Sequence, residues 1–98
     1  MINVVGLGYI GLPTALMLAK AGNEIIGTDY NKSLVETLNK GQVTFKEDGL
    51  PELFNDAVAN GIKFSTEYQE VPFYLFPFFS PKLNNIKNTI IKIFFKSN

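Results

Sequence analysis

Three glycines stand close together near the start of the chain, in the segment VVGLGYIGLP. Gly6, Gly8 and Gly11 follow the spacing G-x-G-x-x-G and come directly after the apolar run INVV of residues 2–5. Such a β-branched run is typical of a strand buried on both faces of a parallel sheet. Residues 10–22 are apolar enough for a buried helix. The glycines are therefore predicted to join a strand to a helix.

A strand, a glycine loop and a helix in this order can hold the pyrophosphate of a dinucleotide. The helix N-terminus offers unpaired N–H groups and the positive end of the helix dipole. Gly6 would allow the tight turn out of the strand, Gly8 would let the backbone approach the phosphates, and Gly11 would let the helix pack close to the strand. The alternative is a strand-to-helix turn that binds no ligand.

An acid at the end of the next predicted strand supports the binding interpretation. Residues 23–29 end at Asp29, 18 residues after Gly11, and dinucleotide-binding proteins place an acid at a spacing of about 20. Its carboxylate would accept hydrogen bonds from the adenosine ribose and would repel the 2′-phosphate of NADP. The chain has no Arg to offset that repulsion. The sequence therefore predicts NAD as the cofactor.

The following elements continue the alternation of strands and helices. The sequence predicts helices over residues 31–41, with Asn31 as N-cap, and over residues 48–61, and then a third strand over residues 62–66. This order implies a parallel sheet with right-handed crossovers. We therefore expect an α/β chain with a partial Rossmann fold, sheet order 3-2-1 and flanking helices. A distorted fourth strand over residues 73–76 would lie beside the first.

These segments resemble the N-terminal NAD-binding domain of the UDP-glucose/GDP-mannose dehydrogenase family, above all its UDP-N-acetyl-mannosamine branch. The resemblance rests on the loop G-L-G-Y-I-G-L-P and on the stretch LNKGQVTFKEDGLPELFNDAVANGIKFSTEY. In that stretch the family's E-P-G-L helix start stands as Glu47, Asp48, Gly49 and Leu50. The resemblance covers about residues 1–70, which we interpret as a truncated NAD-binding Rossmann domain.

Enzymes of this family oxidise the C6 alcohol of a UDP-sugar to a carboxylate in two NAD-dependent steps. The resemblance implies that the backbone around Leu7, Tyr9 and Ile10 lines the pyrophosphate and that Asp29 holds the ribose. Lys32 could reach the same area. The predicted cofactor-binding residues are Gly6, Leu7, Gly8, Tyr9, Ile10, Gly11, Asp29 and Lys32.

The chemistry of the family also needs groups that this sequence does not contain. Its thioester intermediate forms on a Cys and its sugar site uses a second domain, whereas these 98 residues include no Cys. We therefore expect at most the ADP half of the NAD site and no catalysis by the chain alone, with the UDP-sugar a substrate of a full-length enzyme. A non-enzymatic module that binds an adenine dinucleotide and a truncated product without function are the alternatives.

The composition changes abruptly near Val71. Residues 1–70 hold all nine acids and five lysines, whereas residues 71–98 hold four lysines and no acid. Pro77 is expected to interrupt the fourth strand, because a Pro is poorly tolerated in a central strand. We interpret residues 71–98 as a divergent tail.

The end of this tail has three interpretations. One is a C-terminal helix with Ile86, Ile90, Ile93 and Phe94 on one face. Another is a basic, apolar peptide that binds a membrane surface or a partner. The third is out-of-frame translation of AT-rich DNA, which the composition break and the lack of a clear period favour.

The net charge and the hydropathy of the sequence restrict the possible partners and the location of the protein. The formal net charge is zero, which offers no argument for binding nucleic acid. The N-terminus lacks a signal-peptide pattern, and no apolar run approaches the roughly 20 residues of a membrane span. The chain has no His and no Cys, the commonest metal ligands. We therefore expect a cytoplasmic protein with no membrane partner and no metal site.

Overall fold

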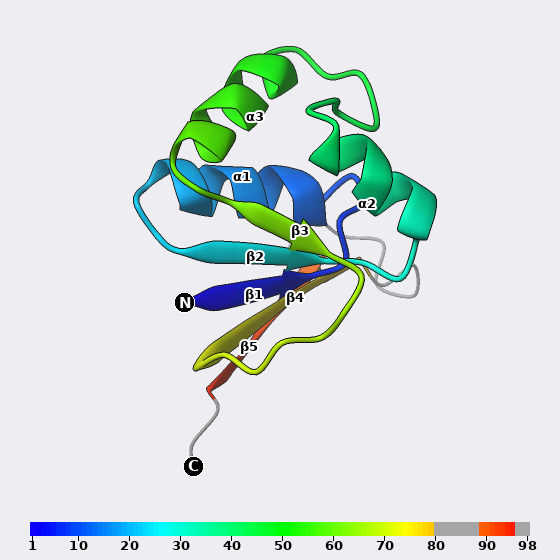
Figure 1. The fold of residues 1–98 in the computed structure, drawn as a ribbon. Helices are drawn as coiled ribbons and strands as arrows, with labels where there is room; N and C mark the ends of the chain where they lie inside the picture. The colour runs from blue at the N-terminus through cyan, green and yellow to red at the C-terminus, as the bar shows by residue number, and fades with distance from the viewer. Residues whose placement is uncertain (80–88, 96–98) are drawn as a thin grey trace.

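The computed structural model describes residues 1–79 and 89–95, with side chains up to Phe76. In this part of the chain, five strands form one sheet in the order β3-β2-β1-β4-β5 (Figure 1). The strands are β1 (Ile2–Val5), β2 (Ile25–Thr28), β3 (Lys63–Ser65), β4 (Phe73–Phe79) and β5 (Thr89–Phe95). The helices are α1 (Gly11–Lys20), α2 (Lys32–Asn39) and α3 (Leu50–Ala59).

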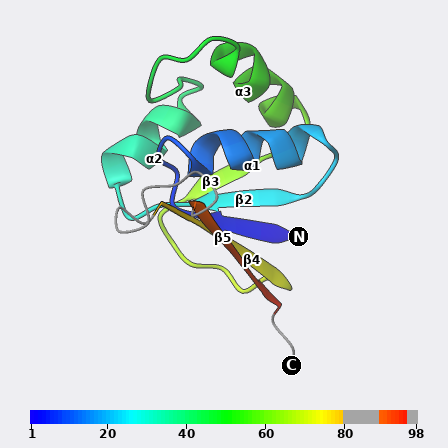
Figure 2. The same ribbon diagram turned by 180° about the vertical axis from the view of Figure 1, so that it is seen from behind.

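The strand β1 lies between β2 and β4 and runs parallel to both. Its residue Val4 pairs with Gly27 of β2 and with Leu75 of β4, and β3 continues the parallel pairing on the far side of β2. The three helices cover one face of the sheet, as Figures 1 and 2 show from opposite sides. The predicted α/β fold, with order 3-2-1 and a fourth strand beside the first, is confirmed.

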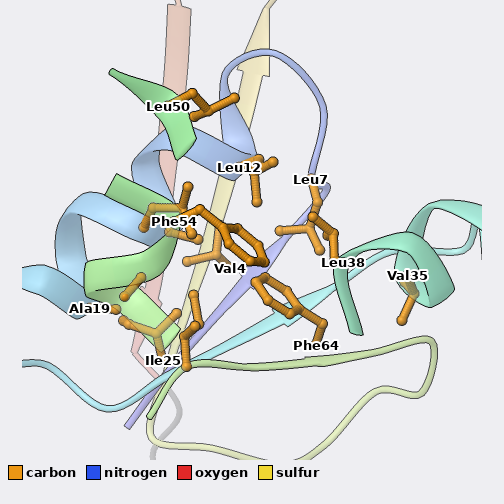
Figure 3. Packing of buried hydrophobic residues seen from close by; sticks show 14 of the residues in the cluster. Val4, Leu7, Leu12, Ala19, Ile25, Val35, Leu38, Leu50, Phe54 and Phe64 are labelled. Atoms are coloured by element: carbon orange, nitrogen blue, oxygen red, sulfur yellow. The ribbon is translucent and has the colours of Figure 1, made fainter. Parts of the chain in front are cut away.

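The hydrophobic core fills the space between the sheet and these helices (Figure 3). Val4 and Leu7 are fully buried, and Phe54 of α3 is 2% exposed. The ring of Phe54 stacks on Phe64 of β3, with ring centroids 5.9 Å apart and planes at 2°. Because aromatic side chains bury much apolar area, this pair ties α3 firmly to the edge of the sheet.

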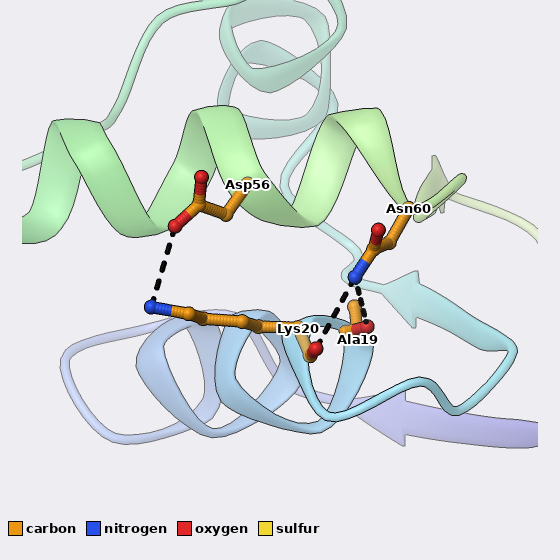
Figure 4. Close-up of polar contacts among 4 residues, drawn as sticks. All are labelled: Ala19, Lys20, Asp56 and Asn60. Carbon is orange, nitrogen blue, oxygen red and sulfur yellow. Dashed lines mark hydrogen bonds and ion pairs between the residues drawn. The ribbon is translucent and has the colours of Figure 1, made fainter.

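Polar groups close the ends of the helices. Asn31 is the N-cap of α2, as predicted, because its Oδ1 accepts a hydrogen bond of 3.1 Å from the Leu34 N–H. Asn60, which follows α3, donates from Nδ2 to the carbonyl oxygens of Ala19 (3.0 Å) and Lys20 (3.2 Å) at the end of α1 (Figure 4). These two bonds bring a donor from the end of α3 to carbonyls of the last turn of α1, of which that of Ala19 also accepts from the Gly22 N–H at 3.0 Å.

An ion pair links the same two helices. Lys20 Nζ lies 3.3 Å from Asp56 Oδ2, and both side chains are more than half exposed (Figure 4). Exposed pairs of this kind contribute at most about 1 kcal/mol. The packing of α3 therefore rests on its apolar face and on Asn60 rather than on this ion pair.

The strand β4 does not stop at Pro77, and that prediction is wrong. The strand runs to Phe79, but its pairing with β1 ends at Leu75. Pro77 therefore lies beyond the residues of β4 that pair with β1. Its missing N–H removes no hydrogen bond from that pairing. On its other side, β4 pairs with β5 in antiparallel fashion.

The helical interpretation of the tail is also wrong for Thr89–Phe95, which forms β5. The run TIIKIFF is almost entirely β-branched or aromatic, and such residues favour strands. Ile86, the first residue of the predicted helical face, lies outside the described residues. The out-of-frame and membrane-surface interpretations stay predictions.

A buried polar pair lies in the sheet. Asn3 is fully buried and Thr28 is 3% exposed, and the Thr28 hydroxyl donates to Asn3 Oδ1 at 2.7 Å. The Nδ2 of Asn3 has no hydrogen-bond partner in the described structure. Since side chains alternate along a strand, Asn3 faces away from the core side that Val4 occupies.

We expect Gly27→Ala to lower the free energy of unfolding by about 1–3 kcal/mol, the usual cost of overpacking. An added Cβ would lie 3.0 Å from Leu7 Cδ2 and 3.0 Å from Phe64 Cδ1. Neither side chain yields easily, because Leu7 is fully buried and Phe64 is stacked on Phe54. Urea denaturation measures the change. Gly8→Ala is the matched control, since its Cβ meets nothing within 4 Å; equal losses in both variants would contradict the packing argument.

We expect Thr28→Val to lower the free energy of unfolding by about 1–3 kcal/mol, because it leaves the buried Asn3 Oδ1 without a partner. The double variant Asn3→Leu/Thr28→Val should recover most of that loss, since no buried polar group remains. Thermal and urea denaturation of the three proteins check this. Thr37→Val, which removes an exposed hydroxyl on α2, serves as control. A double variant less stable than Thr28→Val would show that the pair is not the cause.

Candidate functional site

The glycine loop, residues 6–10, connects the end of β1 to the start of α1. Gly6 has φ +98°, in the region that glycine adopts at little cost. At Gly8 an added Cβ would meet nothing within 4 Å, so the space above the backbone there is open. Gly11 is buried as the first residue of α1. The chain thus turns sharply at Gly6, and at Gly8 no side chain covers the backbone.

A hollow of about 490 Å³ lies over this loop. It is lined by Gly6, Leu7, Gly8, Tyr9, Ile10, Gly11 and Asp29. The structure therefore brings together seven of the eight residues that the sequence predicts for cofactor binding. The eighth, Lys32, is exposed at the first position of α2 and does not line this hollow.

The hollow lies at the N-terminus of α1, where the helix presents free donors. No side chain caps this end, and its first turn contains no acid. The N–H groups of Gly8, Tyr9 and Ile10 donate to no acceptor in the described part of the chain. With the positive end of the helix dipole added, these groups favour an anion with several oxygens, such as a pyrophosphate.

Asp29 forms the rim of the hollow and holds the loop in place. Its Oδ2 accepts from the Leu7 N–H at 2.8 Å, and its Oδ1 accepts from the Asn31 N–H at 2.8 Å. A carboxylate offers about four acceptor positions, so two stay available for the hydroxyls of a ligand. The role of Asp29 in fastening the loop was not predicted, because a bond between residues 7 and 29 leaves no mark in the local sequence.

A second hollow, of about 290 Å³, adjoins the first and shares Gly6 and Asp29 with it. Its wall includes the aromatic side chains of Tyr30, Tyr68 and Phe76. This is the part of the site that sequence reasoning missed. The available signal was the concentration of aromatic residues over residues 68–76. From the sequence alone these residues indicate only a strand and a turn, and the fold is what places them beside Asp29.

Two residues of this hollow, Tyr68 and Phe76, are joined through the ring of Tyr74 into a contiguous aromatic cluster. The ring of Tyr68 lies 5.6 Å from that of Tyr74, and Tyr74 lies 6.2 Å from Phe76. Burial raises the pKa of the Tyr68 phenol, and the neighbouring phenols of Tyr30 and Tyr74 raise it further. A phenol is already neutral at physiological pH at its ordinary pKa, so this shift leaves the charge of Tyr68 unchanged there.

The part of the chain that the structure describes holds no group of three or more His, Cys, Asp or Glu side chains that could bind a metal ion. Within that part, no helix combines the length and the hydropathy that crossing a membrane requires.

Comparison with known proteins places this geometry in a family. Residues 1–74 match the NAD-binding domain of the UDP-glucose/GDP-mannose dehydrogenase family. The chain is 42% identical over 85 residues to an NDP-N-acetyl-D-galactosaminuronic acid dehydrogenase from Ralstonia nicotianae, a match that covers 86% of this chain and 20% of that protein. It is 44% identical over 75 residues to a UDP-N-acetyl-D-mannosamine dehydrogenase from Methanococcus aeolicus, covering 76% and 17% of the two chains.

The chain also resembles solved structures of dehydrogenases. The fold matches the UDP-N-acetyl-mannosamine dehydrogenase Cap5O from Staphylococcus aureus with a TM-score of 0.73 and 38% identity, covering 76% of this chain and 18% of that one. It also matches a ternary complex of GDP-mannose dehydrogenase from Pseudomonas aeruginosa with a TM-score of 0.63 and 31% identity, covering 67% and 15%. The chain spans about a fifth of the length of the curated relatives it matches. It belongs to the UDP-glucose/GDP-mannose dehydrogenase family, whose NAD-binding domain it carries in residues 1–74.

Proposed function

We propose that this chain binds the ADP half of NAD and is the cofactor-binding part of a UDP-sugar 6-dehydrogenase, which oxidises a sugar C6 alcohol to a carboxylate. The observation that carries the proposal is the hollow at the N-terminus of α1, where the glycine loop and Asp29 meet. A cytoplasmic location is part of the same proposal.

The loop would bind the pyrophosphate. The free N–H groups of Gly8, Tyr9 and Ile10 lie at the positive end of α1 and would donate to the phosphate oxygens. The open space at Gly8 lets phosphate approach the backbone, which any larger residue would hinder.

Asp29 would bind the adenosine ribose and select NAD over NADP. Its two hydrogen bonds to backbone N–H groups fix the carboxylate in one orientation, and the remaining acceptor positions suit a ribose diol. A 2′-phosphate would meet this negative charge, and among the described residues no Lys lines either hollow to offset it.

The aromatic hollow beside Asp29 would take the adenine ring. Tyr30, Tyr68 and Phe76 offer flat apolar faces next to the ribose position, and aromatic side chains bind a purine by stacking and by excluding water. This hollow extends the proposed site beyond the residues that the sequence predicts.

We propose that the substrate of the full-length enzyme is an N-acetylated sugar carried on a nucleotide. This proposal rests on the names of the relatives, which specify UDP-N-acetyl-D-mannosamine and an NDP-N-acetyl-D-galactosaminuronic acid. Since these 98 residues include no Cys, a step that needs a thiol nucleophile would use residues of another part of the enzyme. The same absence favours the second candidate function, an NAD-binding module without catalysis of its own.

We expect NAD to raise the melting temperature of the chain, because a ligand at one hundred times its Kd adds about 2.7 kcal/mol to the stability of the folded state. Gly8→Ala should melt like the parent without ligand, since its Cβ meets no protein atom within 4 Å. With NAD, its shift should be much smaller, since the methyl group occupies the phosphate approach. Ser33→Ala, a change on the exposed side of α2, is the control. Equal NAD shifts in Gly8→Ala and the parent would contradict the pyrophosphate assignment.

We expect Asp29→Asn to raise the Kd of NAD by about ten- to a hundredfold and to narrow the difference in affinity between NAD and NADP, because one hydrogen bond to a charged acceptor contributes about 1.5–3 kcal/mol. Isothermal titration calorimetry with both cofactors measures this. Asp56→Asn removes the same charge from the surface of α3, far from the loop, and should leave both Kd values unchanged. If Asp29→Asn binds both cofactors as the parent does, the ribose assignment is wrong.

A further inference from the structure

Tyr9 occupies an unusual position in the glycine loop. Its side chain is 78% exposed, although the residue lines the same hollow as Asp29. Leu7, two residues earlier, is fully buried in the core. The loop therefore has one side chain anchored in the interior and one large ring at the rim of the hollow.

The backbone on both sides of Tyr9 is held by α1. The Gly8 carbonyl accepts from the Leu12 N–H at 3.0 Å, and the Ile10 carbonyl accepts from the Thr14 hydroxyl at 2.7 Å. These bonds fix the peptide groups but leave the Tyr9 side chain free to rotate. Its hydroxyl forms no hydrogen bond to any described residue, so the ring needs another support.

Phe45 supplies that support from a distant part of the chain. The rings of Tyr9 and Phe45 have centroids 4.6 Å apart and planes at 49°, within the range of favourable aromatic pairs. Phe45 lies in the connection between α2 and α3 and packs, partly buried, against the hydrophobic core. It thus joins the exposed ring to the packed interior.

We infer that Phe45 is a positioning residue for NAD binding, which acts by holding the Tyr9 ring at the rim of the pyrophosphate hollow. The inference rests on the proposed function. In the parent chain the ring already lies in one place before the cofactor arrives. Without Phe45, NAD would have to order a mobile aromatic side chain at the mouth of its own site, and that ordering weakens binding.

The test is a set of NAD titrations of the 98-residue chain. Phe45→Leu keeps an apolar group against the core but loses the ring, and we expect it to raise the Kd of NAD about two- to tenfold. Phe45→Tyr keeps the ring and should retain the parent Kd. In a Tyr9→Ala background, Phe45→Leu should cause no further loss, because the ring that it positions is gone.

Val43→Ala separates this role from general stability. Val43 lies in the same connection and also packs, partly buried, against the core, but it is not part of the ring pair. Val43→Ala should lower the melting temperature and leave the Kd unchanged. If Phe45→Leu does not melt cooperatively, Phe45→Met takes its place.

Three results would count against the inference. An unchanged Kd in folded Phe45→Leu would overturn it. So would a loss of NAD affinity on Phe45→Leu that is equal in the parent and in the Tyr9→Ala background. A parent chain that does not bind NAD would overturn the proposed function and this inference together, whereas the first two results leave the proposed function intact.

Discussion

The carboxylate of Asp29 joins the two turns on which the site depends. One oxygen accepts from the Leu7 N–H in the turn after β1, and the other accepts from the Asn31 N–H in the turn after β2. Because β1 and β2 are parallel neighbours, both turns lie at the same edge of the sheet. A single charged group therefore sets the shape of the glycine loop and presents the acceptors that a ribose would use. Asp29 therefore serves both the fold, by joining the two turns, and the proposed cofactor site.

Packing beneath the loop explains why these turns can approach so closely. Leu7 enters the core from the loop, and the bare backbone of Gly27 on β2 makes room for it beside Phe64. A fully buried Leu7 fixes the height of the loop above the sheet. The same short segment thus carries a core residue, a bond to Asp29 and the N–H groups that are free for phosphate. Tyr9, held by Phe45 from the α2–α3 connection, completes the rim.

Local sequence patterns predicted β1, β2, β3 and the three helices, because each depends on short-range periodicity, on caps such as Asn31 and on glycine stops. They also identified four residues that line the larger hollow, namely Gly6, Gly8, Gly11 and Asp29, whereas Leu7, Tyr9 and Ile10 were expected from the family resemblance. The bond from Asp29 to Leu7 and the contact of Phe45 with Tyr9 join residues far apart in the chain, so no local pattern reveals them. The strand β5 was missed because its apolar residues do not alternate, and tertiary pairing with β4 decided its conformation.

A titration of ¹⁵N-labelled chain with NAD, followed in amide correlation spectra, tests whether NAD binds at the glycine loop, since it reports on each N–H group separately. We expect the largest changes at Gly8, Tyr9 and Ile10, whose N–H groups are free in the described structure, and at Leu7 and Asn31, whose N–H groups share the Asp29 carboxylate. The amides of α3 should change little. Spectra that stay the same at millimolar NAD, or changes centred away from the glycine loop, would show that the loop and Asp29 do not form the NAD site.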